Sequence, residues 1–106
     1  MNEAAADSLT IHGSAVAFAG RGILILGASG AGKSRLALGL IGRGAALVAD
    51  DRVVLARRGA ALVALAPAAL VGLVEARGLG ILRLPAVPEA PLALVVDLDR
   101  PVAARS

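Results

Sequence analysis

The sequence predicts an α/β fold with a mixed β-sheet and few helices. A continuous apolar run, residues 23–26, has the length and character of a strand buried on both faces. A glycine-rich segment follows at once, and apolar residues then recur as Leu36, Leu40 and Ile41, as on one face of a helix. The 106-residue chain has 58% hydrophobic and 18% charged residues and no cysteine, which is typical of one packed domain without disulfides.

The first half of the chain predicts three strands and a helix. Residues 1–8 are Ala-rich and acidic and are expected to form a flexible tail, with the folded domain over 9–106. Residues 9–12 and 15–18 predict two short strands that turn at Gly13 and Ser14, and a second turn leads into the apolar strand. The helix is expected over 33–41, ending at Gly42 and Gly44.

The second half predicts further strands and one short helix. A buried strand over 45–49 precedes an aspartate pair, and residues 53–56 and 61–65 predict a hairpin. Pro67 at a first turn predicts a short helix over 67–74. A flexible loop is expected over 77–80 and an extended connection across the prolines at 85, 88 and 91. The last strand is expected over 92–96.

Charge and hydropathy exclude two classes of partner. The net charge is +3, no basic run exceeds Arg57-Arg58, and Phe18 is the only aromatic residue, which argues against nucleic-acid binding. The longest apolar stretch, residues 60–74, is interrupted and shorter than the roughly 20 residues that span a bilayer. The N-terminus lacks the positive start of a signal peptide. We therefore expect a cytoplasmic protein without a membrane or nucleic-acid partner.

One octapeptide carries a phosphate-binding pattern. It matches G-x-x-x-x-G-K-[ST] at every fixed position, after a predicted strand and before a predicted helix. Its lysine is the only one in a chain with ten arginines, and a compact ammonium fits among backbone amides where a planar guanidinium would not. A chance match among 13 glycines explains neither this lysine nor its context. The residues expected to bind the phosphates of ATP are Gly27, Ala28, Ser29, Gly30, Ala31, Gly32, Lys33 and Ser34, with the Ser34 hydroxyl on Mg²⁺.

Three acidic residues and one histidine are the remaining candidates. Asp50 and Asp51 close the strand after the helix, where a phosphate-loop fold places carboxylates that hold magnesium or activate a nucleophile. Neighbouring side chains at a strand end point different ways, so the pair can face a metal and an acceptor hydroxyl; the alternative is a polar turn. His12 and Glu75 have structural alternatives too, a strand histidine and a water-facing charge at the end of a helix.

Four segments in order closely resemble the catalytic domain of the HPr kinase/phosphorylase family: residues 11–13, 22–34, 47–53 and 75–81. The aspartate pair and the E-x-R-G-L-G-I segment are the most specific, because general phosphate-loop proteins do not share them. The resemblance implies a PEP carboxykinase-like nucleotide-binding core. It also implies ATP- and Mg-dependent transfer of phosphate to a serine of HPr, a small phosphocarrier protein of the phosphotransferase system that regulates carbohydrate metabolism.

The resemblance also implies roles for single residues. Lys33 and His12 would belong to the active site, and Ser34 and Glu75 would hold magnesium. One aspartate of the pair would accept the proton of the serine hydroxyl; we assign this to Asp51, with Asp50 as the second candidate. Residues 77–81 would couple the kinase reaction to its phosphorolytic reverse.

The sequence departs from the family after Ile81. Residues 82–92 are proline-rich where the family has a glycine-rich segment, and only Arg100 or Arg105 can stand for a late active-site arginine. We expect a short single-domain form without the family's N-terminal domain. These departures put phosphorolysis and the family's hexamer in question, and a homo-oligomer stays open. The alternative function is a non-catalytic ATP-binding regulatory or sensor module. A small-molecule kinase is disfavoured, since the sequence lacks an arginine-rich lid.

Overall fold

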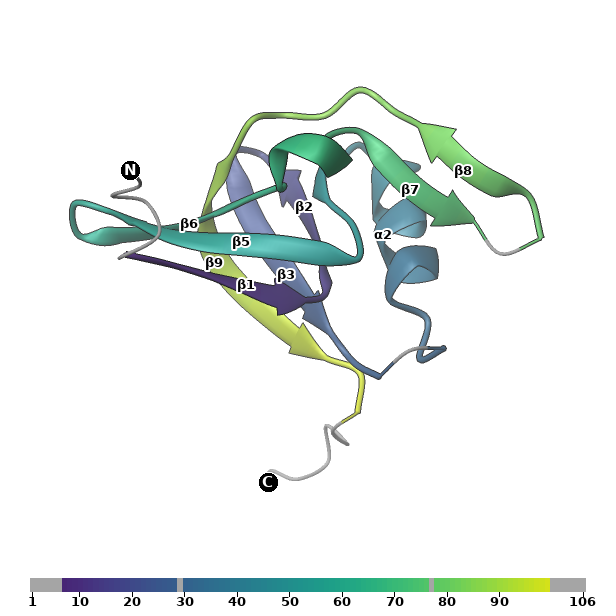
Figure 1. The fold of residues 1–106 in the computed structure, drawn as a ribbon, viewed down its shortest axis with the longest axis horizontal. Coiled ribbons are helices and arrows are strands. Elements are labelled where there is room, and N and C mark those ends of the chain that lie inside the picture. Colours follow the sequence, from purple (N-terminus) through teal and green to yellow (C-terminus); the bar gives the residue numbers. More distant parts are fainter. Residues whose placement is uncertain (1–6, 29, 77, 100–106) are drawn as a thin grey trace.

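The computed structural model describes residues 7–28, 30–76 and 78–99. Within these residues, one α-helix packs on a curled seven-stranded sheet, and a two-stranded sheet lies beside the helix (Figure 1). The strand order in the large sheet is β1-β5-β6-β9-β3-β2-β4. The α/β class and the mixed sheet are therefore as the sequence predicts.

The large sheet consists of two antiparallel groups joined by one strand. The first group contains β1 (Ser8–His12), β5 (Arg52–Arg58) and β6 (Ala61–Leu65). The second contains β2 (Ser14–Phe18), β3 (Arg21–Leu26) and β4 (Ala46–Ala49). Strand β9 (Ala90–Asp97) joins them, antiparallel to β6 and parallel to β3.

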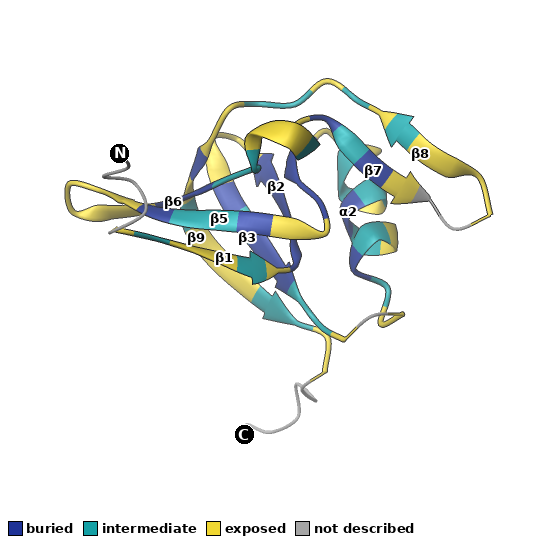
Figure 2. Ribbon diagram, viewed as in Figure 1, coloured by how far each residue is buried: buried dark blue, intermediate teal, exposed yellow. Residues whose placement is uncertain are grey.

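Both faces of the second group are buried, which explains its continuous apolar runs. On one face, Val16 and Ile25 pack against Ala37 of helix α2 (Lys33–Ile41), and all three are at most 1% exposed. On the other face, Leu24 and neighbouring residues pack against residues of β5 and β6 because the sheet curls over them. The buried residues of this group lie in β2, β3 and β4, and Figure 2 shows dark blue stretches in β2 and β3. The expected strand at 23–26 and the helix over 33–41 are confirmed.

The helix predicted over 67–74 is wrong. Only a single 3₁₀ turn, η1 (Ala68–Leu70), forms after Pro67. Gly72 has φ +78, a left-handed conformation that ends any helix, and the chain then enters strand β7 (Leu73–Ala76). Strand β7 pairs with β8 (Gly80–Arg83), a strand that the sequence reading placed partly in a loop. Glu75 therefore lies on a strand and not at the end of a helix.

Smaller differences concern strand ends and pairing. Strand β9 begins at Ala90, two residues before the expected start. The strands on either side of Gly13 do not pair with each other, because β1 pairs with β5 whereas β2 pairs with β3 and β4. The hairpin of β5 and β6 is confirmed. In the described ranges, no helix has the length and apolar character needed to cross a bilayer.

Candidate active site

The glycine loop, residues 27–34, connects the end of β3 to the start of α2. Gly32 is the residue before the helix and has φ +101 and ψ 19, a left-handed conformation that suits glycine. The loop turns through a hydrogen bond from the Ala31 amide to the Ala28 carbonyl, at 3.0 Å. No side chain caps the helix, and its first turn carries no acidic residue. The amides at this end are therefore available to an anion.

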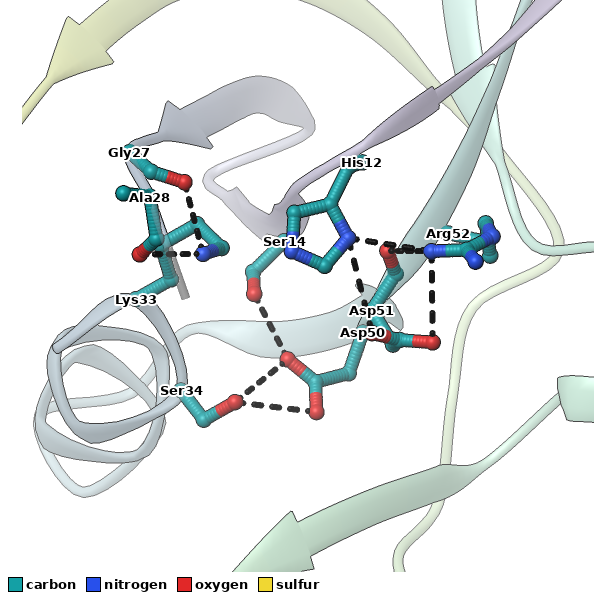
Figure 3. A network of polar contacts seen from close by, with 9 residues as sticks. All are labelled: His12, Ser14, Gly27, Ala28, Lys33, Ser34, Asp50, Asp51 and Arg52. Carbon is teal, nitrogen blue, oxygen red and sulfur yellow. Dashed lines mark hydrogen bonds and ion pairs between the residues drawn. The ribbon is translucent and has the colours of Figure 1, made fainter. Parts of the chain in front are cut away.

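Lys33 bends back onto the loop that precedes it. Its Nζ donates to the carbonyl oxygens of Gly27 at 2.7 Å and of Ala28 at 3.0 Å (Figure 3). The residue is only 7% exposed, so the ammonium lies in a space bounded by the chain itself. A wider guanidinium would have to displace these carbonyl groups.

Asp50 is the buried acid of the site. It is 3% exposed and accepts hydrogen bonds from two hydroxyl groups (Figure 3). Ser14 Oγ lies 2.6 Å from Oδ1, and Ser34 Oγ lies 2.8 Å from Oδ1 and 3.0 Å from Oδ2. No cationic side chain of the described residues forms an ion pair with it. A buried carboxylate held only by hydroxyl groups favours a cation nearby.

Asp51 is the exposed acid of the pair. It has φ +72, an uncommon conformation that aspartate tolerates better than most residues, and its side chain is 60% exposed. The turn is fixed by the Gly13 amide, which donates to the Asp51 carbonyl at 3.2 Å. The two adjacent carboxylates thus separate, Asp50 into the protein and Asp51 toward solvent.

His12 and Arg52 lie beside Asp51. His12 Nδ1 is 3.6 Å from Asp51 Oδ1 and 3.0 Å from Arg52 Nη1, and Arg52 Nη1 is 3.6 Å from Asp51 Oδ2. Arginine can only donate, so His12 Nδ1 accepts in the contact with Arg52.

One pocket of ≈ 550 Å³ brings these groups together. It is lined by His12, Ser14, Gly30, Ala31, Gly32, Lys33, Ser34, Arg35, Leu38, Asp50, Asp51 and Glu75. Glu75 reaches it from β7, whose contact with α2 closes one side. Gly27 and Ala28 accept hydrogen bonds from Lys33 but are not among the lining residues. The other named residues, Ser29, Arg77, Arg100 and Arg105, fall outside the described residues. Nine of the residues named from the sequence therefore share one cavity.

Sequence reasoning missed three lining residues, Ser14, Arg35 and Leu38. Ser14 is a fully buried polar residue at the start of β2, where the sequence predicted a turn, so no sequence pattern marked it. Arg35 and Leu38 lie three residues apart on α2, next to Ser34, so they share one side of the helix. In the described ranges, no group of three or more His, Asp or Glu residues forms a metal cage.

Comparison with known proteins identifies the family. Residues 3–87 match the family described as the HPr Serine kinase C-terminal domain. The HPr kinase/phosphorylase of Limosilactobacillus reuteri is 42% identical over 105 residues, covering 92% of this chain and 33% of the relative. The protein of the same name from Clostridium acetobutylicum is 45% identical over 87 residues, 82% of this chain and 29% of the relative.

A solved structure shares the fold. The HPr(Ser) kinase/phosphatase from Coxiella burnetii superposes with a TM-score of 0.78 at 30% identity, covering 84% of this chain and 58% of that one. The chain spans about a third or less of the length of the two curated relatives above. The match to the family model covers most of the sequence, and the chain belongs to the HPr serine kinase C-terminal domain family.

Proposed function

We propose that this chain is an ATP- and Mg-dependent protein serine kinase that phosphorylates HPr or a related phosphocarrier protein. The observation that carries the proposal is the contact between Ser34 and Asp50 inside the pocket that also holds Lys33 and Asp51. It places a hydroxyl, a buried carboxylate, a cation and an exposed carboxylate around one cavity. The names of the relatives, HPr kinase/phosphorylase, agree with this chemistry.

The glycine loop is the proposed site for the phosphates of ATP. The free amides at the start of α2 donate to phosphate oxygens, and the helix dipole favours their negative charge. Lys33 keeps two of its three N–H donors on the carbonyl groups of Gly27 and Ala28 and offers the third to the outer phosphates.

Ser34 and Glu75 are the proposed magnesium ligands. Their side chains offer oxygen atoms to one pocket, and Mg²⁺ prefers oxygen ligands, taking one or two from protein and others from phosphate and water. The absence of a three-residue acidic cage among the described residues agrees with this mode of binding. Bound there, magnesium would neutralise charge on the phosphates. Asp50 orients the Ser34 hydroxyl from behind.

Asp51 is the proposed base. Its exposed carboxylate accepts the proton of the incoming serine hydroxyl. The serine oxygen forms a bond to the γ-phosphorus, the bond from that phosphorus to the bridging oxygen breaks, and ADP leaves. Arg52 Nη1, 3.6 Å away, attracts the carboxylate from one side, and His12 lies beside it.

Incubation of the purified protein with γ-labelled ATP, magnesium and HPr tests the proposal. Label on an HPr serine is the expected result, and none without magnesium. A full-length relative serves as the positive control. Phosphoserine-HPr with inorganic phosphate tests the reverse reaction, which we expect to be weak or absent. Tight ATP binding without transfer to any phosphocarrier would instead indicate a nucleotide sensor.

A further inference from the structure

We propose that Asp99 is a positioning residue that holds the ammonium of Lys33 in place through the peptide group between Gly27 and Ala28. The catalytic consequence rests on the proposed nucleotide site, but the structural claim does not. Asp99 lies just after β9, some seventy residues along the chain from the loop that it contacts.

Strand β9 brings Asp99 to the loop. It runs parallel to β3, with Leu26 opposite Asp97, so the residues that follow both strands continue side by side. The Leu98 amide donates to the Leu26 carbonyl at 2.8 Å. The Asp99 amide then donates to Asp97 Oδ1 at 2.9 Å, which turns the chain toward the glycine loop.

A single peptide group connects the two charged side chains. Asp99 Oδ2 accepts from the Ala28 N–H at 2.9 Å, and Lys33 Nζ donates to the Gly27 C=O at 2.7 Å. That N–H and that C=O belong to one planar peptide unit and, because it is trans, they point in opposite directions. The carboxylate and the ammonium therefore bind opposite ends of the same dipole.

The two hydrogen bonds reinforce each other. Both involve an ionised partner, which makes each stronger than a neutral bond. Each polarises the peptide in the sense that strengthens the other. Rotation of the peptide would break both bonds at once, so the carboxylate of Asp99 determines which way the Gly27 carbonyl faces.

Packing beneath the loop limits other arrangements. A Cβ placed on Gly27 would lie 3.2 Å from Leu98 Cβ and 3.1 Å from Ala31 Cβ. Both distances are shorter than most contacts of real Cβ atoms, so residue 98 sits directly against the loop. The end of β9 thus supports the loop by a main-chain bond, by packing and by the Asp99 carboxylate.

The single lysine of this chain allows a direct test. Protein labelled with ¹³C at lysine Cε gives one lysine signal by NMR. In Asp99→Ala the signal should sharpen and move toward that of free lysine, and ADP should bind about ten-fold more weakly. Asp99→Asn keeps a neutral acceptor for the Ala28 amide and should hold the wild-type signal and keep ADP affinity within about three-fold. Glu89→Ala, at an acid paired with Arg58 away from the loop, is the matched control.

Two results would overturn the inference. One is a lysine signal that does not change in Asp99→Ala while the protein stays folded. The other, which needs no variant, is fast hydrogen exchange of the Ala28 amide in the wild-type protein. Failure of phosphate transfer to HPr in the wild type would contradict the kinase proposal and leave the lysine signal as predicted.

Discussion

The hydroxyl of Ser34 lies 2.8 Å and 3.0 Å from the two carboxylate oxygens of Asp50, and its hydrogen points to the buried side of the site. A hydroxyl that donates in one direction keeps its lone pairs for the other. Ser34 therefore presents an acceptor oxygen to the pocket, as a ligand of a cation must. Asp50, which also lines the pocket, orients this hydroxyl by accepting its hydrogen bond.

Ser34→Ala removes the oxygen from the pocket, so it should abolish the gain in ADP affinity that magnesium gives. Ser34→Thr keeps the hydroxyl and should retain most of that gain. Calorimetric titration with ADP, with magnesium and with a chelator, measures the difference. An equal magnesium effect in Ser34→Ala and the wild type would show that Ser34 is not a ligand.

Ser14→Ala should destabilise the fold. Ser14 is fully buried and its hydroxyl bonds the buried Asp50 at 2.6 Å, so its loss leaves a carboxylate with one donor fewer. We expect a loss of about 1–3 kcal/mol in the free energy of unfolding, measured in urea. Ser8→Ala on the edge strand β1 is the control and should change it by less than about 0.5 kcal/mol.

Asp51→Asn should separate catalysis from binding. The exposed amide keeps the size of the side chain but cannot take a proton, so kcat should fall roughly 10²- to 10⁴-fold. ADP affinity should stay near that of the wild type, since the Asp51 side chain is largely exposed and is proposed to contact the incoming serine and not the nucleotide. Steady-state assays with HPr and calorimetry with ADP provide the two numbers. A mutant with near-normal kcat would transfer the role of base to another residue.

Lys33→Arg should sharply weaken nucleotide binding although it preserves charge. The ammonium lies 2.7 Å and 3.0 Å from two carbonyl oxygens, and Lys33 is only 7% exposed. The wider planar guanidinium of arginine does not fit in that space. Equilibrium binding of a fluorescent ATP analogue tests this, with Arg43→Lys, an exposed residue just after α2 and not among the residues that line the pocket, as a charge-preserving control. Unchanged affinity in Lys33→Arg would show that the loop adapts to guanidinium.

Two glycine substitutions should act in opposite directions. Gly32→Ala places a Cβ at φ +101, which costs about 1–2 kcal/mol although nothing lies within 4 Å. A Cβ on Gly39, within α2, would also meet no atom within 4 Å. Because alanine favours the helix more than glycine does, Gly39→Ala should stabilise the protein by about 0.5–1 kcal/mol. Thermal unfolding of both variants measures this contrast. Equal shifts would mean that the left-handed conformation of Gly32 is not required.

Local patterns predicted the elements around the glycine loop. The apolar strand, the loop and the helix follow one another in sequence, so their positions depend on short-range signals. The placement of His12, Asp50 and Asp51 at the pocket follows from the strand ends beside them, and that of Lys33 from the start of α2.

Strand pairing between segments far apart in the sequence could not be predicted from such local patterns. An apolar segment with proline at its start, residues 67–74, reads as a helix, but the partner strand β8 draws Leu73–Ala76 into a hairpin. Ser14 and Asp99 were missed for a related reason. Each acts on a residue more than thirty positions away, and no spacing in the sequence reports such a contact.

The central place of β9 has a consequence for the order of assembly. The groups β1-β5-β6 and β3-β2-β4 share no strand pairing until β9 enters between β6 and β3. During synthesis a nascent chain would expose the complete phosphate-binding motif long before residues 90–99 leave the ribosome. Strand pairing between segments so far apart in sequence is slower than pairing between neighbouring strands. We therefore expect the proposed nucleotide site to mature only after residues 90–99 have joined the sheet, although the glycine loop is translated well before them.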